Sequence, residues 1–139
     1  MKLLMNARCM VSGDASGPAL VSRRAFTFAH GVDPVTGTVT DVRSDIRGES
    51  VKGRVLIYPF GKGSTTASAW FLETVRLGNG PAAVLTESPD PGVVIGSVLA
   101  RILYGVSIPV MTSVPQQAYR IPSGENVVVS CMEGRIAVG

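Results

Sequence analysis

The pattern of apolar and polar positions changes character near the middle of the 139-residue chain. In the first half, residues 19–21 form a short apolar run, and residues 25–28 alternate apolar and polar side chains with a period of two. Both patterns predict strands. Residues 31–37 contain Asp-Pro and end in Gly37, which predicts a turn in which this glycine takes a positive φ. The first half is therefore expected to consist of strands joined by turns.

The second half alternates between strand and helix patterns. Residues 54–58 are apolar and rich in β-branched side chains, as expected for a buried strand. Two glycines follow within residues 61–63, and apolar side chains then recur at the spacing of one helix face over residues 67–75. The glycines of residues 78–80 end this predicted helix. Its buried face is expected to comprise Ala67, Trp70, Phe71, Thr74 and Val75.

The same alternation continues toward the C-terminus. Residues 81–86 predict a strand, and residues 91–103 a second helix that has Pro91 in its first turn and ends at Gly105. Residues 108–111 predict the next strand. A β-α-β-α-β order with short connections implies parallel strands joined by right-handed crossovers.

The C-terminal segment, residues 126–138, has the pattern of a hairpin with Glu133-Gly134 at its turn. No internal repeat or composition break divides the chain, so residues 1–139 are expected to form one domain. The predicted fold class is α/β: a small central parallel sheet with crossover helices and additional flanking strands.

Composition limits the partners of this domain. Hydrophobic residues make up 45% and charged residues 17% of the chain, so disorder is not expected. Two interpretations of the low charge stay open: a surface partly covered by a protein partner, or an unusually neutral exterior. Residues 1–8 are too short and polar for a leader, and the apolar run 93–103 is interrupted by polar residues. We expect a soluble, cytoplasmic protein that does not bind membranes.

Charge and cysteine content exclude further classes. The net charge is +3, the 13 Lys and Arg residues are scattered, and aromatic residues make up only 6%, which is not typical of nucleic-acid binding. Cys9 and Cys131 are far apart in sequence and cannot ligate a structural zinc or an iron–sulfur cluster alone. They are expected to be free buried thiols in a reducing compartment, and no metal site is expected on this chain.

The candidate site is the glycine-rich turn between a predicted strand and a predicted helix. Glycines allow a sharp bend and close approach of a ligand, and the N–H groups at a helix start favour an anion. Lys62 adds a positive charge, and hydroxyl groups follow it. We expect Ser64 to be the catalytic residue. The residues expected to bind substrate are Gly61, Lys62, Gly63, Thr65 and Thr66.

This turn has three other possible interpretations. The nucleotide P-loop pattern fails, because Gly63 separates Lys62 from Ser64 and no glycine precedes Lys62 by five residues. Ser64 as a simple helix N-cap stays open. A self-contained serine hydrolase is disfavoured, because His30 is the only histidine and no G-x-S-x-G elbow is present. A serine base supported by Lys62 and the helix start remains, with the other catalytic groups on another chain.

Taken together, these segments resemble the swivelling-domain family of aconitase X. The resemblance covers nearly the whole chain and depends on the order and spacing of its pieces. These are residues 17–22, 28–37, 47–50, 53–56, 61–68, 80–84 and 108–110.

The resemblance implies a swivelling β/β/α fold and a hydro-lyase (dehydratase) in which this chain is the small subunit, inactive alone. The partner it implies is a large catalytic subunit that carries an iron centre, usually an iron–sulfur cluster, so that this chain binds no cofactor itself. The family's catalytic serine, a general base, corresponds to Ser64. The substrate would be a small anion.

The family contains two activities, dehydration of cis-3-hydroxy-L-proline, mostly in bacteria, and of mevalonate 5-phosphate, in archaea. The low charge content is unlike that of hyperthermophilic proteins and favours the first activity, with the second as the alternative. A non-catalytic anion-binding module is a further alternative. The chain departs from common family forms at Phe60, often a small residue, and at Ala67, often glycine.

Overall fold

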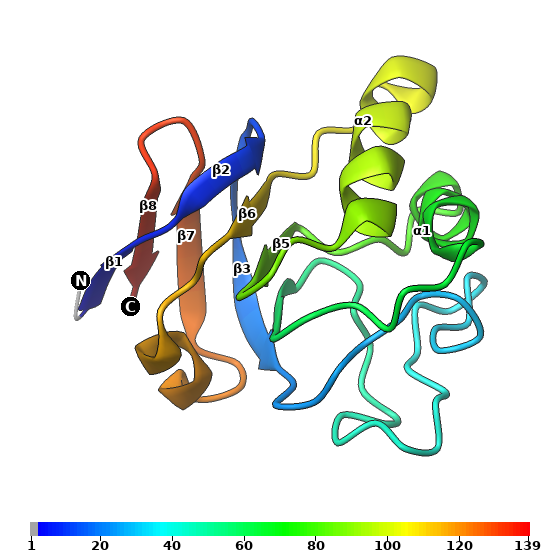
Figure 1. Ribbon diagram of the computed structural model, residues 1–139, viewed down its shortest axis with the longest axis horizontal. Coiled ribbons are helices and arrows are strands. Elements are labelled where there is room, and N and C mark those ends of the chain that lie inside the picture. The colour runs from blue at the N-terminus through cyan, green and yellow to red at the C-terminus, as the bar shows by residue number, and fades with distance from the viewer. Residues whose placement is uncertain (1–2) are drawn as a thin grey trace.

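An eight-stranded sheet runs through the computed structural model, which describes residues 3–139 (Figure 1). Its strands lie in the order β1-β8-β7-β3-β4-β5-β6-β2. The neighbours from β3 to β6 pair in parallel, and all other neighbours pair antiparallel. The strands are β1 (Leu3–Asn6), β2 (Arg8–Val11), β3 (Asp14–Val21), β4 (Val55–Tyr58), β5 (Ala83–Thr86), β6 (Val110–Thr112), β7 (Asn126–Ser130) and β8 (Arg135–Val138).

Two crossover helices join the parallel strands, as the sequence predicted. Helix α1 (Ala67–Arg76) connects β4 to β5, and α2 (Pro91–Tyr104) connects β5 to β6. The two helices pack against each other on one side of the sheet (Figure 1). Proline at the first position of α2 and Gly105 just after it, with φ 66°, confirm both expected boundaries. Neither helix has the length and apolarity needed to cross a bilayer.

The sheet curls until its two edges meet. Strands β1 and β2 lie at opposite edges of the sheet, yet only Ala7 separates them in the chain. The N–H of Ala7 donates a hydrogen bond to the carbonyl of Gly134, 3.0 Å away, which fastens the junction to the β7–β8 turn. The sequence analysis did not predict β1 and β2, because each contains only four residues and neither alternates clearly.

Side chains of the central strands alternate between two hydrophobic clusters. Leu56 and Tyr58 of β4 lie in the cluster on the helical side, together with Phe71 of α1. Val55 and Ile57 lie in the opposite cluster, which is completed by β7, β8 and the short 3₁₀ helix η1 (Gln116–Arg120). Because both faces of β4 are covered, its residues are apolar without alternation. The layers are therefore β/β/α, in agreement with the fold expected from the resemblance.

The strand predicted for residues 25–28 is wrong. Among these four residues, only Phe26 forms a β-bridge, which is isolated and joins it in parallel to Gly61. Phe26 and Phe28 are both buried in the helical-side cluster, and their rings meet edge to face at 5.4 Å. A spacing of two between apolar residues predicts a strand, but here it belongs to an irregular segment between β3 and β4 that packs on α1 through Phe28 and Phe71. Gly37 does take the predicted positive φ, 77°.

The expectation of two free thiols is also wrong. Cys9 and Cys131 form a disulfide, although they lie 122 positions apart in the chain, with their Cα atoms 5.0 Å apart. Closure of the sheet explains the pairing. Cys9 of β2 pairs with Met111 of β6, and Cys131 directly follows β7, so both reach the cluster on the β side. Local sequence contains no sign of this contact because it depends on how the sheet edges meet.

Candidate active site

The glycine turn after β4 is held by the irregular segment that contains Phe26. The N–H of Phe26 donates to the carbonyl of Phe60 at 3.0 Å, and the N–H of Lys62 donates to the carbonyl of Phe26 at 3.1 Å. Directly after these two hydrogen bonds, Gly63 takes a φ of 76°, a conformation that other residues rarely adopt. The backbone is therefore directed from the end of β4 toward α1, and Ser64 lies just before the first residue of this helix.

A cleft of about 240 Å³ lies between this turn and the start of α2. Residues 61 and 63–65 form one wall, and residues 89–92 form the other. The wall formed by residues 63–65 leads into α1, which begins at Ala67, while Pro91 and Gly92 are the first residues of α2. Two helix N-termini thus lie at one cleft, and the positive ends of their dipoles favour an anionic ligand there.

Ser64 is half-buried at this cleft and forms hydrogen bonds with its neighbour Thr66. The N–H of Thr66 donates to Ser64 Oγ at 3.2 Å, and the two hydroxyl oxygens lie 3.0 Å apart, where either can donate. The N-cap position of α1 is Thr66, two residues after Ser64. Ser64 is therefore not the helix N-cap; it lines the cleft, and its hydroxyl oxygen has the N–H and hydroxyl of Thr66 beside it.

Asp90 is a cleft residue that the sequence analysis missed. It lies on the wall opposite Ser64, is only 8% exposed, and accepts a hydrogen bond from the buried hydroxyl of Tyr58 at 2.7 Å. Burial, followed by the negative charge of Asp90, raises the pKa of Tyr58 well above its ordinary value. The position just before Pro91 is typical of an N-cap, but Asp90 makes no side-chain capping bond because it turns toward Tyr58.

Gly61 provides the space for this carboxylate. A Cβ atom at residue 61 would lie 2.5 Å from Asp90 Oδ2 and 2.8 Å from Oδ1. Any side chain at this position would displace Asp90 or the turn. The glycine therefore serves the packing of the cleft wall in addition to the bend expected from the sequence.

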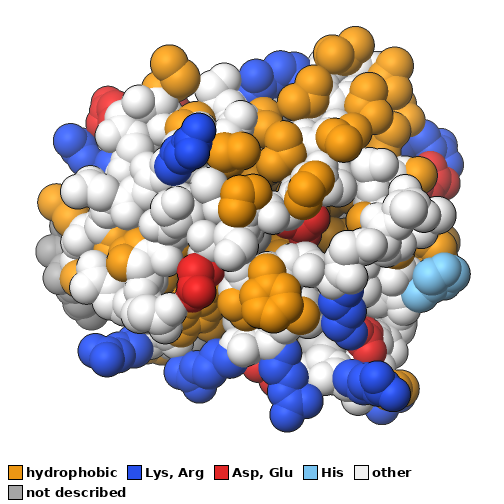
Figure 2. Space-filling view, viewed as in Figure 1, with side chains coloured by type: hydrophobic (Ala, Val, Ile, Leu, Met, Phe, Trp, Pro, Cys, Tyr) orange, Lys and Arg blue, Asp and Glu red, His pale blue; other side chains and the backbone are white. Residues whose placement is uncertain are grey.

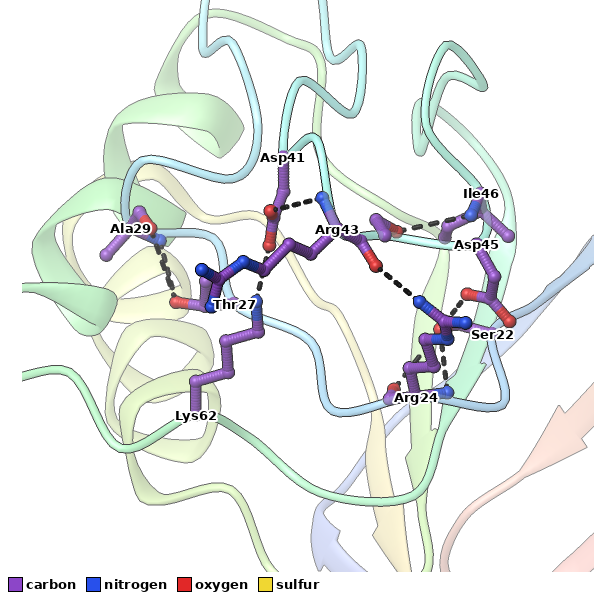
Figure 3. A network of polar contacts seen from close by, with 10 residues as sticks. Ser22, Arg24, Thr27, Ala29, Asp41, Arg43, Asp45, Ile46 and Lys62 are labelled. Atoms are coloured by element: carbon purple, nitrogen blue, oxygen red, sulfur yellow. Dashed lines mark hydrogen bonds and ion pairs between the residues drawn. The ribbon is translucent and has the colours of Figure 1, made fainter.

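Lys62 directs its charge away from the cleft. Its ammonium forms an ion pair with Asp41 Oδ2 at 2.5 Å, as Figure 3 shows. The hydrogen bond from Lys62, followed by one from the N–H of Arg43, lowers the pKa of Asp41 below its ordinary value. Of the expected site residues, the structure brings together Gly61, Gly63, Ser64 and Thr65 around the cleft, with Thr66 bonded to Ser64, while Lys62 joins the network around Asp41.

His30 does not line the cleft. Its ring lies against Trp70 of α1 with ring centroids 4.4 Å apart, and its φ is 58°. The indole N–H of Trp70 donates to the carbonyl of Val32 at 2.7 Å, so this pair belongs to the packing between α1 and the preceding segment. The arrangement contains no Ser-His pair.

The resemblance implies an iron centre on a partner subunit, and the cleft residues of this chain do not form an iron site of their own. Asp90 is the one carboxylate among the residues that line the cleft, and both cysteines are bonded to each other. Within residues 3–139, no three His, Cys, Asp or Glu side chains gather as a metal site would require. We therefore derive no step through a metal held by this chain.

Comparisons with known proteins agree with this fold. The family model described as the aconitase X swivel domain matches residues 4–138. The chain is 37% identical to the phosphomevalonate dehydratase small subunit of Pyrococcus horikoshii, covering 88% of this chain and 85% of that protein. It is also 37% identical to the protein of the same name from Thermococcus sibiricus, covering 96% and 97%.

A solved structure shows the same architecture. The crystal structure of aconitase X from Thermococcus kodakaraensis, in its holo form, superposes with a TM-score of 0.87 at 32% identity and covers 99% of this chain and 98% of that one. The sequence match and the shared β/β/α layers lead to the same assignment. The chain belongs to the aconitase X swivel domain family.

Proposed function

We propose that this chain is the small subunit of an aconitase X-type hydro-lyase that dehydrates mevalonate 5-phosphate. The observation that carries the proposal is the position of Ser64, which lines a cleft between two helix N-termini. The names of the relatives from Pyrococcus and Thermococcus support the substrate. They favour this activity over the dehydration of cis-3-hydroxy-L-proline, to which the low charge content pointed.

Ser64 acts as the general base in this proposal. Its Oγ, in the alkoxide form, accepts the proton from the carbon next to the substrate carboxylate, and the electron pair of that C–H bond forms the double bond as the hydroxyl group leaves as hydroxide. The hydroxide takes the proton back from Ser64, which gives water and restores the alkoxide. The N–H and hydroxyl of Thr66 stabilise the serine oxygen when it carries negative charge, and the start of α1 adds to this effect. These donors act on the serine oxygen as the donors of an oxyanion hole act on a substrate oxygen.

The groups that help the hydroxyl to leave belong to the partner in this proposal. A large subunit of the aconitase X type would hold the iron centre, and this centre would supply Lewis-acid chemistry for the departure of the hydroxyl group. The small subunit contributes the base and the anion-binding helix starts. Asp90, the one other ionisable side chain among the cleft residues, is bonded to the hydroxyl of Tyr58, which accords with a division of the active site between two chains.

The test is reconstitution. The chain is co-expressed with the aconitase X-type large subunit of the same organism, and the purified complex is assayed with mevalonate 5-phosphate and with cis-3-hydroxy-L-proline. We expect dehydration of the first. Ser64→Ala is expected to lower kcat by about 10³-fold or more, since loss of a general base costs 10²–10⁴-fold, while the complex still assembles.

Ser123→Ala serves as the control, because Ser123 is an exposed serine that lies away from the cleft. Its kcat should equal that of the wild type. Activity retained in Ser64→Ala would remove Ser64 from the mechanism. Dehydration of cis-3-hydroxy-L-proline but not of mevalonate 5-phosphate would identify the first compound as the substrate. Anion binding by the isolated chain, with no dehydration by any complex, would identify a binding module.

A further inference from the structure

Helix α2 has an apolar face that points away from the protein. Pro91, Ile95, Val98 and Ile102 recur along its whole length and lie within about 60° of one another around the axis, given 3.6 residues per turn. Ile95, Val98 and Ile102 are 51%, 43% and 71% exposed. We call these four residues the outer stripe. In Figure 2, hydrophobic side chains gather over α2 at the upper right.

The opposite face of α2 makes the contacts that hold this helix against the rest of the protein. Gly96 and Ala100 lie on that buried face, and a Cβ atom at residue 96 would lie 2.6 Å from the ring of Phe71 on α1. The helix therefore packs closely on α1 through small residues. The outer stripe lies outside this buried face and belongs to neither hydrophobic cluster, so the fold of the chain does not explain its apolar character.

Polar side chains are missing where solvent would require them. Arg101 is the one charged residue of α2, and it bonds sideways to the carbonyl of Ser12 and to the hydroxyl of Ser107, 3.2 Å away. A helix exposed to water on one side normally has charged and polar residues there. An apolar surface along a whole helix typically marks a protein–protein contact.

The stripe is continuous with the candidate active site. Pro91, its first residue, lines the cleft that contains Ser64, and Phe60, which is 51% exposed, precedes the cleft residue Gly61. From Pro91 to Ile102 the stripe extends about 16 Å from the cleft, at 1.5 Å per residue. A partner that completes the cleft must cover its rim, and the apolar surface on that rim continues along α2.

We propose that the outer stripe of α2 together with Phe60 is the surface on which the large subunit docks. This inference rests on the proposed function, because it takes the occupant to be the chain that completes the active site. The partner is expected to present an uncharged, apolar surface to α2. Docking there brings the catalytic groups of the partner to the cleft wall formed by the start of the same helix.

Ile102→Glu tests the proposal at the end of the stripe away from the cleft. A charge buried in an apolar contact is unfavourable, so we expect the affinity for the large subunit to fall by about 100-fold or more. Val35→Glu is the matched control, because Val35 is similarly exposed, at 73%, but lies in the irregular segment before β4. Circular dichroism and thermal unfolding of both isolated variants should match the wild type.

Affinity is measured by titration calorimetry with the purified large subunit, and the mass of the small chain alone by light scattering. Loss of binding in Ile102→Glu but not in Val35→Glu supports the proposal. Wild-type affinity in Ile102→Glu overturns it, as does a dimer of the small chain that Ile102→Glu dissociates without weakening the complex. Failure of the wild-type chain to bind the large subunit overturns it as well.

The two proposals fail in different ways. A complex that assembles through the stripe but dehydrates neither substrate would contradict the proposed function and leave the docking surface in place. An active complex that tolerates Ile102→Glu would contradict the docking surface and leave the function in place.

Discussion

The two sides of the sheet formed by β3, β4, β5 and β6 differ in how completely they are covered. On the β side, strands β7 and β8 and helix η1 enclose one hydrophobic cluster, and a disulfide links β2 to the residue after β7. On the helical side, α1 and α2 cover the other cluster (Figure 1). They leave a cleft between their N-termini and an apolar stripe on α2. The first side is fastened by a covalent cross-link, whereas the second has an open site and an uncovered helix face.

This difference separates stability from function within a small chain. Changes on the β side are expected to lower the free energy of unfolding without altering the cleft. Changes at the cleft are expected to affect activity more than stability. Asp90 is the exception that connects the two, because it lines the cleft and accepts the hydrogen bond of Tyr58, a core residue of β4.

Removing the disulfide should have the largest effect on stability. A cross-link between distant residues restricts the unfolded chain, and its loss typically lowers the free energy of unfolding by about 2–4 kcal/mol. We expect a reducing agent to shift the urea midpoint of the wild type to lower concentration and to leave Cys9→Ala unchanged. Equal midpoints with and without reductant in the wild type would contradict the prediction. The activity of the folded, reduced complex should persist.

Asp90→Ala tests the connection between core and cleft. The change leaves the hydroxyl of Tyr58, which is buried, without its acceptor, and we expect a loss of about 1–3 kcal/mol in the free energy of unfolding. The double variant Tyr58→Phe/Asp90→Ala should cost less than the sum of the single changes, because the unpaired hydroxyl is gone. Strict additivity in denaturant unfolding would show that the two residues are not coupled.

The pair of Tyr58 and Asp90 also makes the free energy of unfolding decrease at alkaline pH. Because the pKa of Tyr58 is raised in the folded state, the unfolded state loses its proton first as pH rises. Stability from this group is fully present below about pH 10, the pKa of an unperturbed tyrosine, and declines above it. Tyr58→Phe should flatten this decline. Burial also raises the pKa of Tyr119 to about 12, so part of the alkaline decline should remain in the variant.

Two glycines of the turn provide a sharper comparison. Gly61→Ala places a methyl group against the carboxylate of Asp90, and such overpacking costs about 1–3 kcal/mol. Gly63→Ala meets no atom within 4 Å, but it forces a side chain into a φ of 76°, at about 1–2 kcal/mol. Only Gly61→Ala should change the coupling between Tyr58 and Asp90 in the double-variant cycle. An equal effect of both alanines on that coupling would contradict the packing role of Gly61.

The smallest effect is expected at the ion pair of Lys62 and Asp41. The pKa of Asp41 is lowered in the folded state, so the pair stabilises the protein above the pKa of an unfolded aspartate, near 3.9, and this contribution is lost as pH falls through the folded value. Lys62→Met should cost a few tenths of a kcal/mol at neutral pH, since the pair is partly exposed. The cost should vanish in strong acid.

Lys52→Met is the control for this pair, because Lys52 is an exposed lysine. It should show no such dependence on pH. A larger loss of turnover than of stability in Lys62→Met would indicate that its charge acts on the substrate, as the sequence predicted, in addition to holding Asp41.

The elements with strong local patterns were predictable. The run of apolar residues in β4, the helical spacing in α1, and the proline and glycine at the ends of α2 each specify a local structure. The glycine turn was recognisable for the same reason, and with it Ser64 as the candidate base. Asp90 was not found, because the signal before Pro91 points to a capping residue and only the fold reveals Tyr58 beside it.

Sequence by itself determined the alternation of strands and helices, the parallel order of β4, β5 and β6, and the glycine turn that carries Ser64. Tertiary structure alone decided that Cys9 meets Cys131, that Asp90 faces Ser64 across a cleft, and that the outer stripe of α2 stays uncovered. The physical reason is the range of the interactions. Backbone geometry and side-chain periodicity act over a few residues, whereas closure of the sheet joins segments more than a hundred residues apart.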